Sequence, residues 1–340
     1  MRKEKIKSID FIKGICAIGI LLFHFESHYT SRALTFVSNY FDAGAVVTVF
    51  FMVSGALLQY HYSQKLDLKE YYIKRWKGIY PMFYLAYIPC WILNVLRHGA
   101  VLYNGPASSY LYTFLGIDGY LAQRVDTYYI LGEWFLGAII ALYLVYPLLR
   151  WLFVKNKWVA VAGALALYLV FYDQPITNAN AFWSISSCLI SFTLGMFLLE
   201  FRKQIVTLPA VSLAALGYIL LSVLRVPMPV NAGRHLLGIC LFVLLFALGE
   251  KVMARPRLER VFVELGKLSY PIFLVHHVIL WAVLQIWQPV AWWQIGLLAA
   301  LVVAVVLVVA KVLAIITNFV LTKFQLIWSK GRNNKPVLEK

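Results

Sequence analysis

Long continuous apolar runs constrain this chain more than any other feature. The sequence contains ten runs that approach or exceed the roughly 18–20 apolar residues that a helix needs to cross a bilayer. They cover residues 9–25, 43–62, 79–97, 128–150, 157–173, 181–200, 208–225, 232–249, 268–288 and 294–321. Hydrophobic residues make up 62% of the 340 and charged residues only 14%, too few polar groups to cover a water-soluble domain of this size. We therefore predict an all-α, polytopic membrane helical bundle of about ten transmembrane helices, and not an alternating β-barrel.

Most basic residues lie in loops that the predicted spans place on one side of the membrane. If the chain starts in the cytoplasm, the cytoplasmic side receives the basic residues of 2–7, 65–77, 150–157, 202–203, 251–267 and 323–340. The opposite side receives only Arg32, Arg97, Arg124, Arg225 and Arg234. Cytoplasmic loops of membrane proteins carry such an excess. We therefore expect both termini in the cytoplasm and a multi-pass protein of the cytoplasmic (inner or plasma) membrane.

The net charge of +16 is thus first a topology signal, and we expect membrane lipids rather than nucleic acid as partners. The whole chain, 1–340, is predicted to be a single integral membrane domain with a basic cytoplasmic tail at 323–340 and no appended soluble domain. The four cysteines lie inside apolar runs and form no spacing motif, which predicts neither a disulfide framework nor a metal site.

The first span carries polar residues along one face. Asp10, Lys13, His24 and His28 fall within an arc of about 60° on a helix. Asp10 and Lys13 can pair near the cytoplasmic end, whereas His24 lies about 21 Å further along. This face either lines a passage through the membrane, or holds an interfacial ion pair and a histidine used in helix packing. His24 and His28 have a spacing that suits zinc, but no other helix offers a convincing ligand set, and we expect no metal.

Two further spans combine small or basic residues with apolar ones. Ser54 and Gly55 lie among large apolar residues of the second span, where small residues let helices approach closely. Lys74, Arg75 and Lys77 open the third span. They either anchor that helix in the interface or clamp a phosphate group, for which arginine supplies a bidentate fork.

Glu133 and His276 are the remaining ionisable candidates inside predicted spans. Glu133 lies in the outer part of the fourth span, at a depth similar to that of His24, where it either orients the imidazole or has a structural role. His276 lies near the middle of the ninth span on one face with Ser269, and His277 lies on the next face with Tyr270. The alternative is that either histidine only holds helices together. Ionisable groups at such positions usually face the bundle interior or a wet cavity.

Five blocks, in this order, resemble the acyltransferase-3 family of integral membrane acyltransferases. They are Asp10 with Lys13-Gly14 and His24; Phe50-Phe51-Met52-Val53-Ser54-Gly55; Arg75-Trp76-Lys77-Gly78-Ile79-Tyr80-Pro81; Trp134-Phe135-Leu136 with Tyr143 and Pro147; and Ser269-Tyr270-Pro271-Ile272-Phe273-Leu274-Val275-His276. Lys13 stands where the family pattern has arginine. Gly78 stands where it has a second basic residue, with Lys77 one position earlier.

The resemblance implies an enzyme that moves an acyl group, usually acetyl, from cytoplasmic acyl-CoA to a hydroxyl of an extracytoplasmic acceptor, commonly a cell-envelope or exopolysaccharide sugar. It implies an essential His24 and a role for Arg75 with the donor. We expect His24 and Glu133 as catalytic residues and Arg75, Lys74, Lys77 and Lys13 as donor-binding residues. Further candidates are Asp10, Ser54, Tyr80, Trp134, Tyr270 and His276. Acetyl-CoA is expected as donor substrate, with no tightly bound cofactor.

Two other classes of function stay open at this point. A proton-coupled secondary transporter of a small solute also needs buried His, Asp and Glu, although the sequence shows none of the inverted repeats common in such proteins. A lipid-binding scaffold is the third alternative, and it predicts no turnover. The sequence leaves open the acceptor, the acyl chain length, a direct or covalent transfer, a separate partner protein and the oligomeric state.

Overall fold

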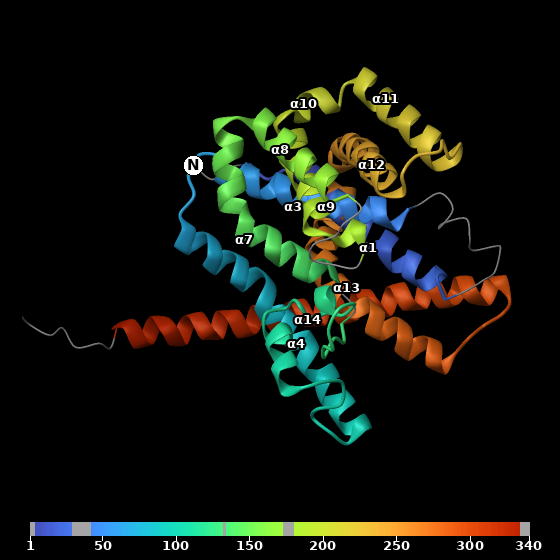
Figure 1. The fold of residues 1–340 in the computed structure, drawn as a ribbon. Helices are drawn as coiled ribbons and strands as arrows, with labels where there is room; N and C mark the ends of the chain where they lie inside the picture. The colour runs from blue at the N-terminus through green and yellow to red at the C-terminus, as the bar shows by residue number, and fades with distance from the viewer. Residues whose placement is uncertain (1–3, 29–41, 132–133, 173–179, 334–340) are drawn as a thin grey trace, which may run out of the picture.

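The computed structural model describes residues 4–28, 42–131, 134–172 and 180–333, with backbone alone from 327 onward. All regular structure in these ranges is helical, which confirms the predicted all-α class. The main helices in chain order are α1 (Lys7–Glu26), α3 (Ala43–Tyr62), α4 (Leu68–His98), α7 (Trp134–Lys155), α8 (Lys157–Val170), α9 (Ile185–Glu200), α11 (Leu208–Tyr218), α12 (Val230–Met253), α13 (Pro256–Ile286) and α14 (Trp292–Asn333). Figure 1 shows their arrangement.

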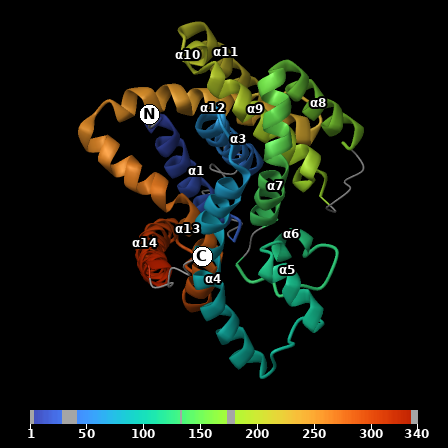
Figure 2. The same cartoon turned by 90° about the vertical axis from the view of Figure 1, so that its left-hand side faces the viewer.

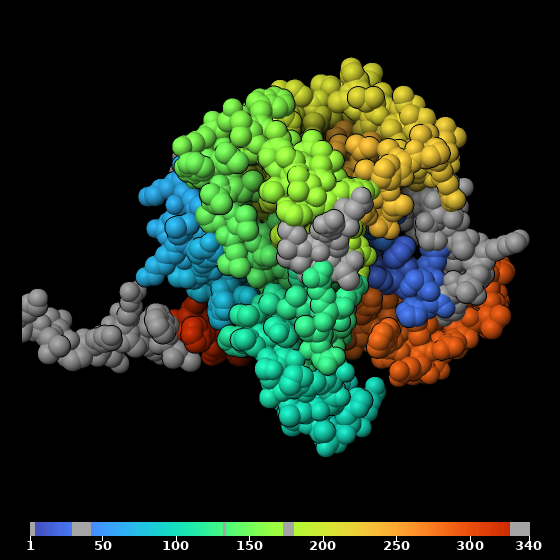
Figure 3. Space-filling view, viewed as in Figure 1, coloured from blue at the N-terminus to red at the C-terminus, as the bar shows by residue number. Residues whose placement is uncertain are grey.

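Short elements join these helices. They are η1 (Ala107–Ser109), α5 (Tyr110–Phe114), α6 (Asp118–Leu121), η2 (Ala181–Trp183), α10 (Arg202–Ile205) and the π-helical turn η3 (Ile219–Val223) that continues α11. The segment 98–130, with η1, α5 and α6, projects from the bundle together with the end of α4 (Figures 1 and 3). Its helices are too short to span a membrane, as the sequence indicates.

Seven helices of the described ranges are long and apolar enough to cross a bilayer. Three shorter apolar helices, at 157–170, 185–200 and 208–223, match the fifth, sixth and seventh predicted spans. The molecule is therefore a multi-pass helical membrane bundle. Ten crossings and cytoplasmic termini stay predictions. The N-terminal end of α1 and the far end of α14 do lie on the same side of the bundle (Figures 1 and 2).

Two helices begin about three turns before the predicted membrane spans that they contain. α4 begins at Leu68 instead of 79, after Asp67 accepts a hydrogen bond from the backbone N–H of Glu70 at 2.8 Å. α13 begins with Pro256 at its first position, instead of at 268. Both extensions are rich in charge, because a helix needs apolar residues only where it meets lipid.

α1 lies at the centre of the bundle, where α13, α12 and α3 pack around it (Figure 2). Its contact with α13 is close at Gly266, where an added Cβ would stand 2.5 Å from the carbonyl oxygen of Asp10. Both helices therefore run side by side with their backbones nearly touching. This contact sets the position of His24 relative to the histidines of α13.

α3 and α9 make a second close contact. A Cβ on Gly55 would stand 2.0 Å from the carbonyl oxygen of Phe192, and one on Gly195 would stand 1.9 Å from that of Met52. Only glycine permits this approach. The packing interpretation of the Ser54-Gly55 pair is therefore confirmed for Gly55.

Candidate active site

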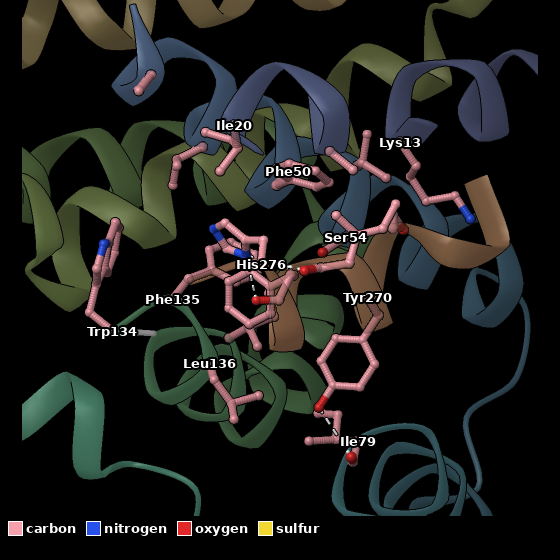
Figure 4. A pocket seen from close by; sticks show the side chains of 18 of the residues that line it. Lys13, Ile20, Phe50, Ser54, Ile79, Trp134, Phe135, Leu136, Tyr270 and His276 are labelled. Carbon is pink, nitrogen blue, oxygen red and sulfur yellow. Dashed lines mark hydrogen bonds between the residues drawn. The ribbon is translucent and has the colours of Figure 1, made fainter. Parts of the chain in front are cut away.

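One large cavity of about 600 Å³ runs between α1, α3, α4, α7 and α13. Figure 4 shows Lys13 at one end and Trp134 at the other, with His276 between them. The lining of α1 consists of Lys13, Ala17, Ile20, Phe23 and His24. These residues recur at helical spacing, so one face of α1 lines the passage, as the first of the two sequence interpretations proposed.

Arg75 and Lys13 occupy the end of the cavity nearest the basic loops. The Arg75 guanidinium lies 5.6 Å from the ring centre of Tyr143 and 5.9 Å from that of Tyr71. Its Nε is buried without a hydrogen-bond partner, and no described carboxylate forms an ion pair with it. A cation held between aromatic faces without a carboxylate is suited to bind an anion.

Asp10 lies outside the cavity lining and pairs with a lysine that lines this end of the cavity. Its buried carboxylate pairs with Lys13 at 2.9 Å and also with Lys5. The carboxylate itself is absent from the cavity lining. Asp10 thus holds Lys13 in place, because a buried carboxylate between two ammonium groups needs both of them for compensation.

Two of the basic residues of the third span lie away from the cavity. Lys74 is exposed and pairs with Glu70 one turn earlier at 2.6 Å. Lys77 is exposed and does not line the cavity, whereas Arg75, Gly78 and Ile79 do. Successive helical residues are about 100° apart, so one face of α4 cannot present all three cations. Tyr80 also points elsewhere and donates to the carbonyl of Leu115 at 2.9 Å.

Lys267 is a cavity residue that the sequence analysis did not single out. It lines the same end as Arg75 and pairs with Glu264 at 2.6 Å, while Lys311 of α14 pairs with the other oxygen of Glu264 at 2.8 Å. The available signal was its position three residues before Tyr270, a spacing that places both residues on one helix face; Tyr270 also lines the cavity.

Three imidazoles meet at the middle of the passage. The ring centre of His24 lies 5.3 Å from that of His276 and 4.2 Å from that of His277. His276 is buried, and its Nδ1 lies 2.8 Å from the carbonyl oxygen of Phe273 and 3.1 Å from that of Ile272. Because a carbonyl only accepts, Nδ1 carries the proton and Nε2 keeps its lone pair.

Ser54, Ser269 and Tyr270 complete the polar lining near the middle and the basic end. The Tyr270 hydroxyl donates to the carbonyl of Ile79 at 3.1 Å, and Ser269 donates to that of Gly266 at 3.0 Å (Figure 4). Tyr270 therefore ties α13 to α4 beside the passage. Most of the other lining side chains are apolar, including Phe50, Phe135 and Ile139.

The far end of the cavity is aromatic. The rings of Trp134 and Trp183 stack with centres 4.8 Å apart and planes 9° from parallel. Arg234 lies with its guanidinium 5.1 Å from the Phe182 ring centre and its Nε 3.6 Å from Asp42. Trp183, Phe182 and Arg234 join the site only through the fold, although Arg234 was visible in the sequence as one of the few basic residues opposite the basic loops. Glu133, the second predicted catalytic residue, lies outside the described residues.

The sequence matches the model of a known protein family over most of its length. The model of the acyltransferase domain of the acyltransferase-3 family matches residues 6–316. The chain belongs to the acyltransferase-3 family. It is therefore a multi-pass membrane acyltransferase, and the matched range contains every helix that lines the cavity. No curated protein matches the chain, and no solved structure matches it.

Most of the predicted site residues lie together in the acyltransferase. Lys13, His24, Ser54, Arg75, Trp134, Tyr270 and His276 line one cavity. Asp10 reaches the site through Lys13, whereas Lys74, Lys77 and Tyr80 face away from the cavity. His28 lies beyond the end of α1 and does not line the cavity.

Proposed function

We propose that this acyltransferase moves an acetyl or other short acyl group from cytoplasmic acyl-CoA to a hydroxyl group of an acceptor across the membrane, a cell-envelope or exopolysaccharide sugar. The observation that carries the proposal is the single cavity that joins Arg75 at one end, His24 in the middle and Trp183 at the other end. A donor and an acceptor that enter from opposite ends would meet at the imidazole.

The basic end suits the phosphate groups of acyl-CoA. Arg75 offers a bidentate fork without a competing carboxylate, and Lys13 and Lys267 add positive charge beside it. From Lys13 to His24, α1 rises by roughly 16 Å. The extended pantetheine arm spans roughly 15–20 Å. A donor with its phosphates at Arg75 therefore brings its thioester to the depth of His24.

At that depth His24 acts as general base. It takes the proton of the acceptor hydroxyl, and the oxygen attacks the thioester carbonyl carbon as the new C–O bond forms. The C–S bond then breaks, and the CoA thiolate leaves and recovers the proton from the imidazolium. A covalent relay, in which His24 first carries the acyl group, yields the same products. The apolar lining keeps bulk water, which would hydrolyse the thioester, away from this point.

The aromatic end suits a sugar. The Trp134–Trp183 pair presents a broad flat surface, and sugar rings have apolar faces that can pack against such a surface. Arg234 adds hydrogen-bond donors at the same end. These features support a polyhydroxylated ring as acceptor more than a small inorganic solute.

The test combines a cell and a vesicle experiment. Deleting the gene and comparing envelope glycans by mass spectrometry should show the loss of an acetyl-sized increment, and the His24→Ala protein should not restore it. Purified protein in proteoliposomes should then consume labelled acetyl-CoA only when glycan from the deletion strain is present. Unchanged glycans together with flux of a solute through the vesicles would replace the proposal with the transporter alternative.

A further inference from the structure

His24 and His276 line the centre of the cavity, and His277 packs against both rings. General base catalysis by His24 alone does not require this cluster of three imidazoles. His24 comes from α1, and His276 and His277 are neighbours on α13. One ligating nitrogen from each of them lies within 4.8 Å of the other two. Neighbouring residues on one helix point about 100° apart, so both reach His24 only because α13 crosses α1 closely.

The distances fit a tetrahedral metal centre. Zinc binds histidine nitrogen at about 2.0–2.1 Å, so two imidazole rings on one zinc ion have centres about 5 Å apart. The three pairs here have ring centres 5.3, 4.2 and 4.4 Å apart. Two nitrogens on one tetrahedral zinc ion lie about 3.4 Å apart, so nitrogens spaced by as much as 4.8 Å must close by up to about 1.4 Å. Rotations of the half-buried His24 and His277 side chains supply this shift.

The orientation of His276 fits as well. Its Nδ1 lies 2.8 and 3.1 Å from the carbonyl oxygens of Phe273 and Ile272, so the ring proton is on Nδ1 and the lone pair is on Nε2, the nitrogen that would bind a metal. A backbone carbonyl on the second ring nitrogen is the usual support of a metal-binding histidine, because it fixes the tautomer and the ring plane. His24 and His276 both line the cavity, so the fourth position of such an ion faces the cavity, where a single water molecule or a substrate group can bind it.

We infer that His24, His276 and His277 bind Zn²⁺ or a similar divalent transition metal, and that the bound ion inhibits acyl transfer. Imidazole is a preferred ligand of zinc, copper and nickel, and three imidazoles without a carboxylate or thiolate select these ions over Mg²⁺ and Ca²⁺. The ion takes the lone pair that His24 needs in order to accept the acceptor proton. Metal binding stands on the geometry alone, whereas the inhibition rests on the proposed function.

Direct binding tests the site without reference to activity. Purified protein stripped with a chelator is titrated with Co²⁺, whose visible absorption becomes intense in a tetrahedral site. We expect one ion per chain, displacement by Zn²⁺, and affinity weaker by more than about tenfold in His277→Ala and His276→Ala. His61→Ala is the matched control, since His61 is exposed on α3 and bonded to the carbonyl of Leu57. Equal Co²⁺ binding in all three variants would overturn the site.

A second measurement uses the unaltered protein, so a variant that fails to fold cannot obscure the answer. Histidines are modified with diethyl pyrocarbonate, with and without Zn²⁺, and located by peptide mass spectrometry. We expect Zn²⁺ to protect the peptides that carry His24, His276 and His277 while His61 reacts equally in both samples. Equal modification of the three cavity histidines with and without the metal contradicts the proposal.

Inhibition is measured last, on acetyl transfer in proteoliposomes. Zn²⁺ should inhibit the unaltered protein reversibly, with recovery on addition of chelator, and the His277→Ala protein should need more than about tenfold higher Zn²⁺ for half-inhibition of its own metal-free rate. Metal binding without inhibition of an active enzyme would overturn the regulatory half alone. A protein that binds Co²⁺ through these histidines but transfers no acyl group would overturn the proposed function and leave the metal site standing.

Discussion

Gly266 of α13 packs directly on the backbone of Asp10 of α1, so closely that a Cβ at Gly266 would stand 2.5 Å from the Asp10 carbonyl oxygen. The same contact brings His276 against His24 ten or more residues further along both helices, with ring centres 5.3 Å apart. A glycine near the basic end of the cavity therefore determines the geometry at its centre.

Gly266→Ala should separate the two helices and destabilise the protein. Overpacking of this kind costs about 1–3 kcal/mol, which outweighs the gain of about 1 kcal/mol for replacing a helical glycine by alanine. Thermal unfolding followed by fluorescence in detergent would show a lower midpoint, and acyl transfer should fall with it. Gly163→Ala on α8 is the control, because its added Cβ meets no atom within 4 Å. A Gly266→Ala protein as stable as this control would contradict the role of the contact.

His24→Ala should reduce acceptor acylation by about 10²–10⁴-fold, the usual contribution of a general base, or abolish it if the relay operates. Acyl-CoA affinity should change little, because the proposed phosphate site at Arg75 lies at the other end of the cavity. The rate is measured with labelled acetyl-CoA and the affinity by equilibrium binding. The His61→Ala protein serves as the reference, and turnover equal to that reference would remove His24 from the reaction.

Arg75→Ala should raise the KM for acyl-CoA, by about 10- to 100-fold if two charge-assisted hydrogen bonds are lost. Arg75→Lys should recover only part of the affinity, since lysine keeps the charge without the fork. Lys74→Ala provides the comparison, because Lys74 is the neighbouring cation and pairs with Glu70 on the exposed side of the same helix. Similar KM values for the Arg75 and Lys74 variants would place the donor phosphates elsewhere.

Trp183→Ala should weaken use of the acceptor while leaving use of the donor unchanged. The substitution removes one ring of the stacked pair at the aromatic end. We expect the binding free energy of the acceptor to weaken by about 1 kcal/mol or more. The measurement is the KM for acceptor glycan at saturating acetyl-CoA. Trp158→Ala, on the exposed face of α8, controls for loss of a tryptophan. An altered donor KM in Trp183→Ala would show that this end serves the donor.

Hydropathy predicted the helix segments that contact lipid, because lipid contact requires apolar residues. It did not predict the charged helix ends, which can lie in water. The second span, 43–62, coincides with α3. α4 and α13 begin before the third and ninth predicted spans, because their first turns carry charges that a hydropathy window excludes. A helix can continue through charged residues outside the lipid. The first residue of such a helix is therefore set by a capping residue such as Asp67 and not by hydropathy.

The sequence predicted which site residues share a face of one helix, but not which residues of different helices meet. Helical spacing was enough to place Lys13 and His24 on one face of α1, since both lie on the same chain segment. The same spacing could not reveal that His277 lies against His24, because that contact depends on how α13 crosses α1. Trp183 joins Trp134 for the same reason, through packing between separate helices.

The length of α14 has a practical consequence. Its 42 residues rise roughly 63 Å, about twice the thickness of the hydrocarbon layer. A helix of this length extends beyond a bilayer that it crosses, and its last turns lie on the side of the bundle where α1 begins (Figures 1 and 2). A fluorescent reporter fused beyond Asn333 would sit on a rigid spacer, well away from the route taken by either substrate, and its signal in living cells would reveal which compartment that side faces.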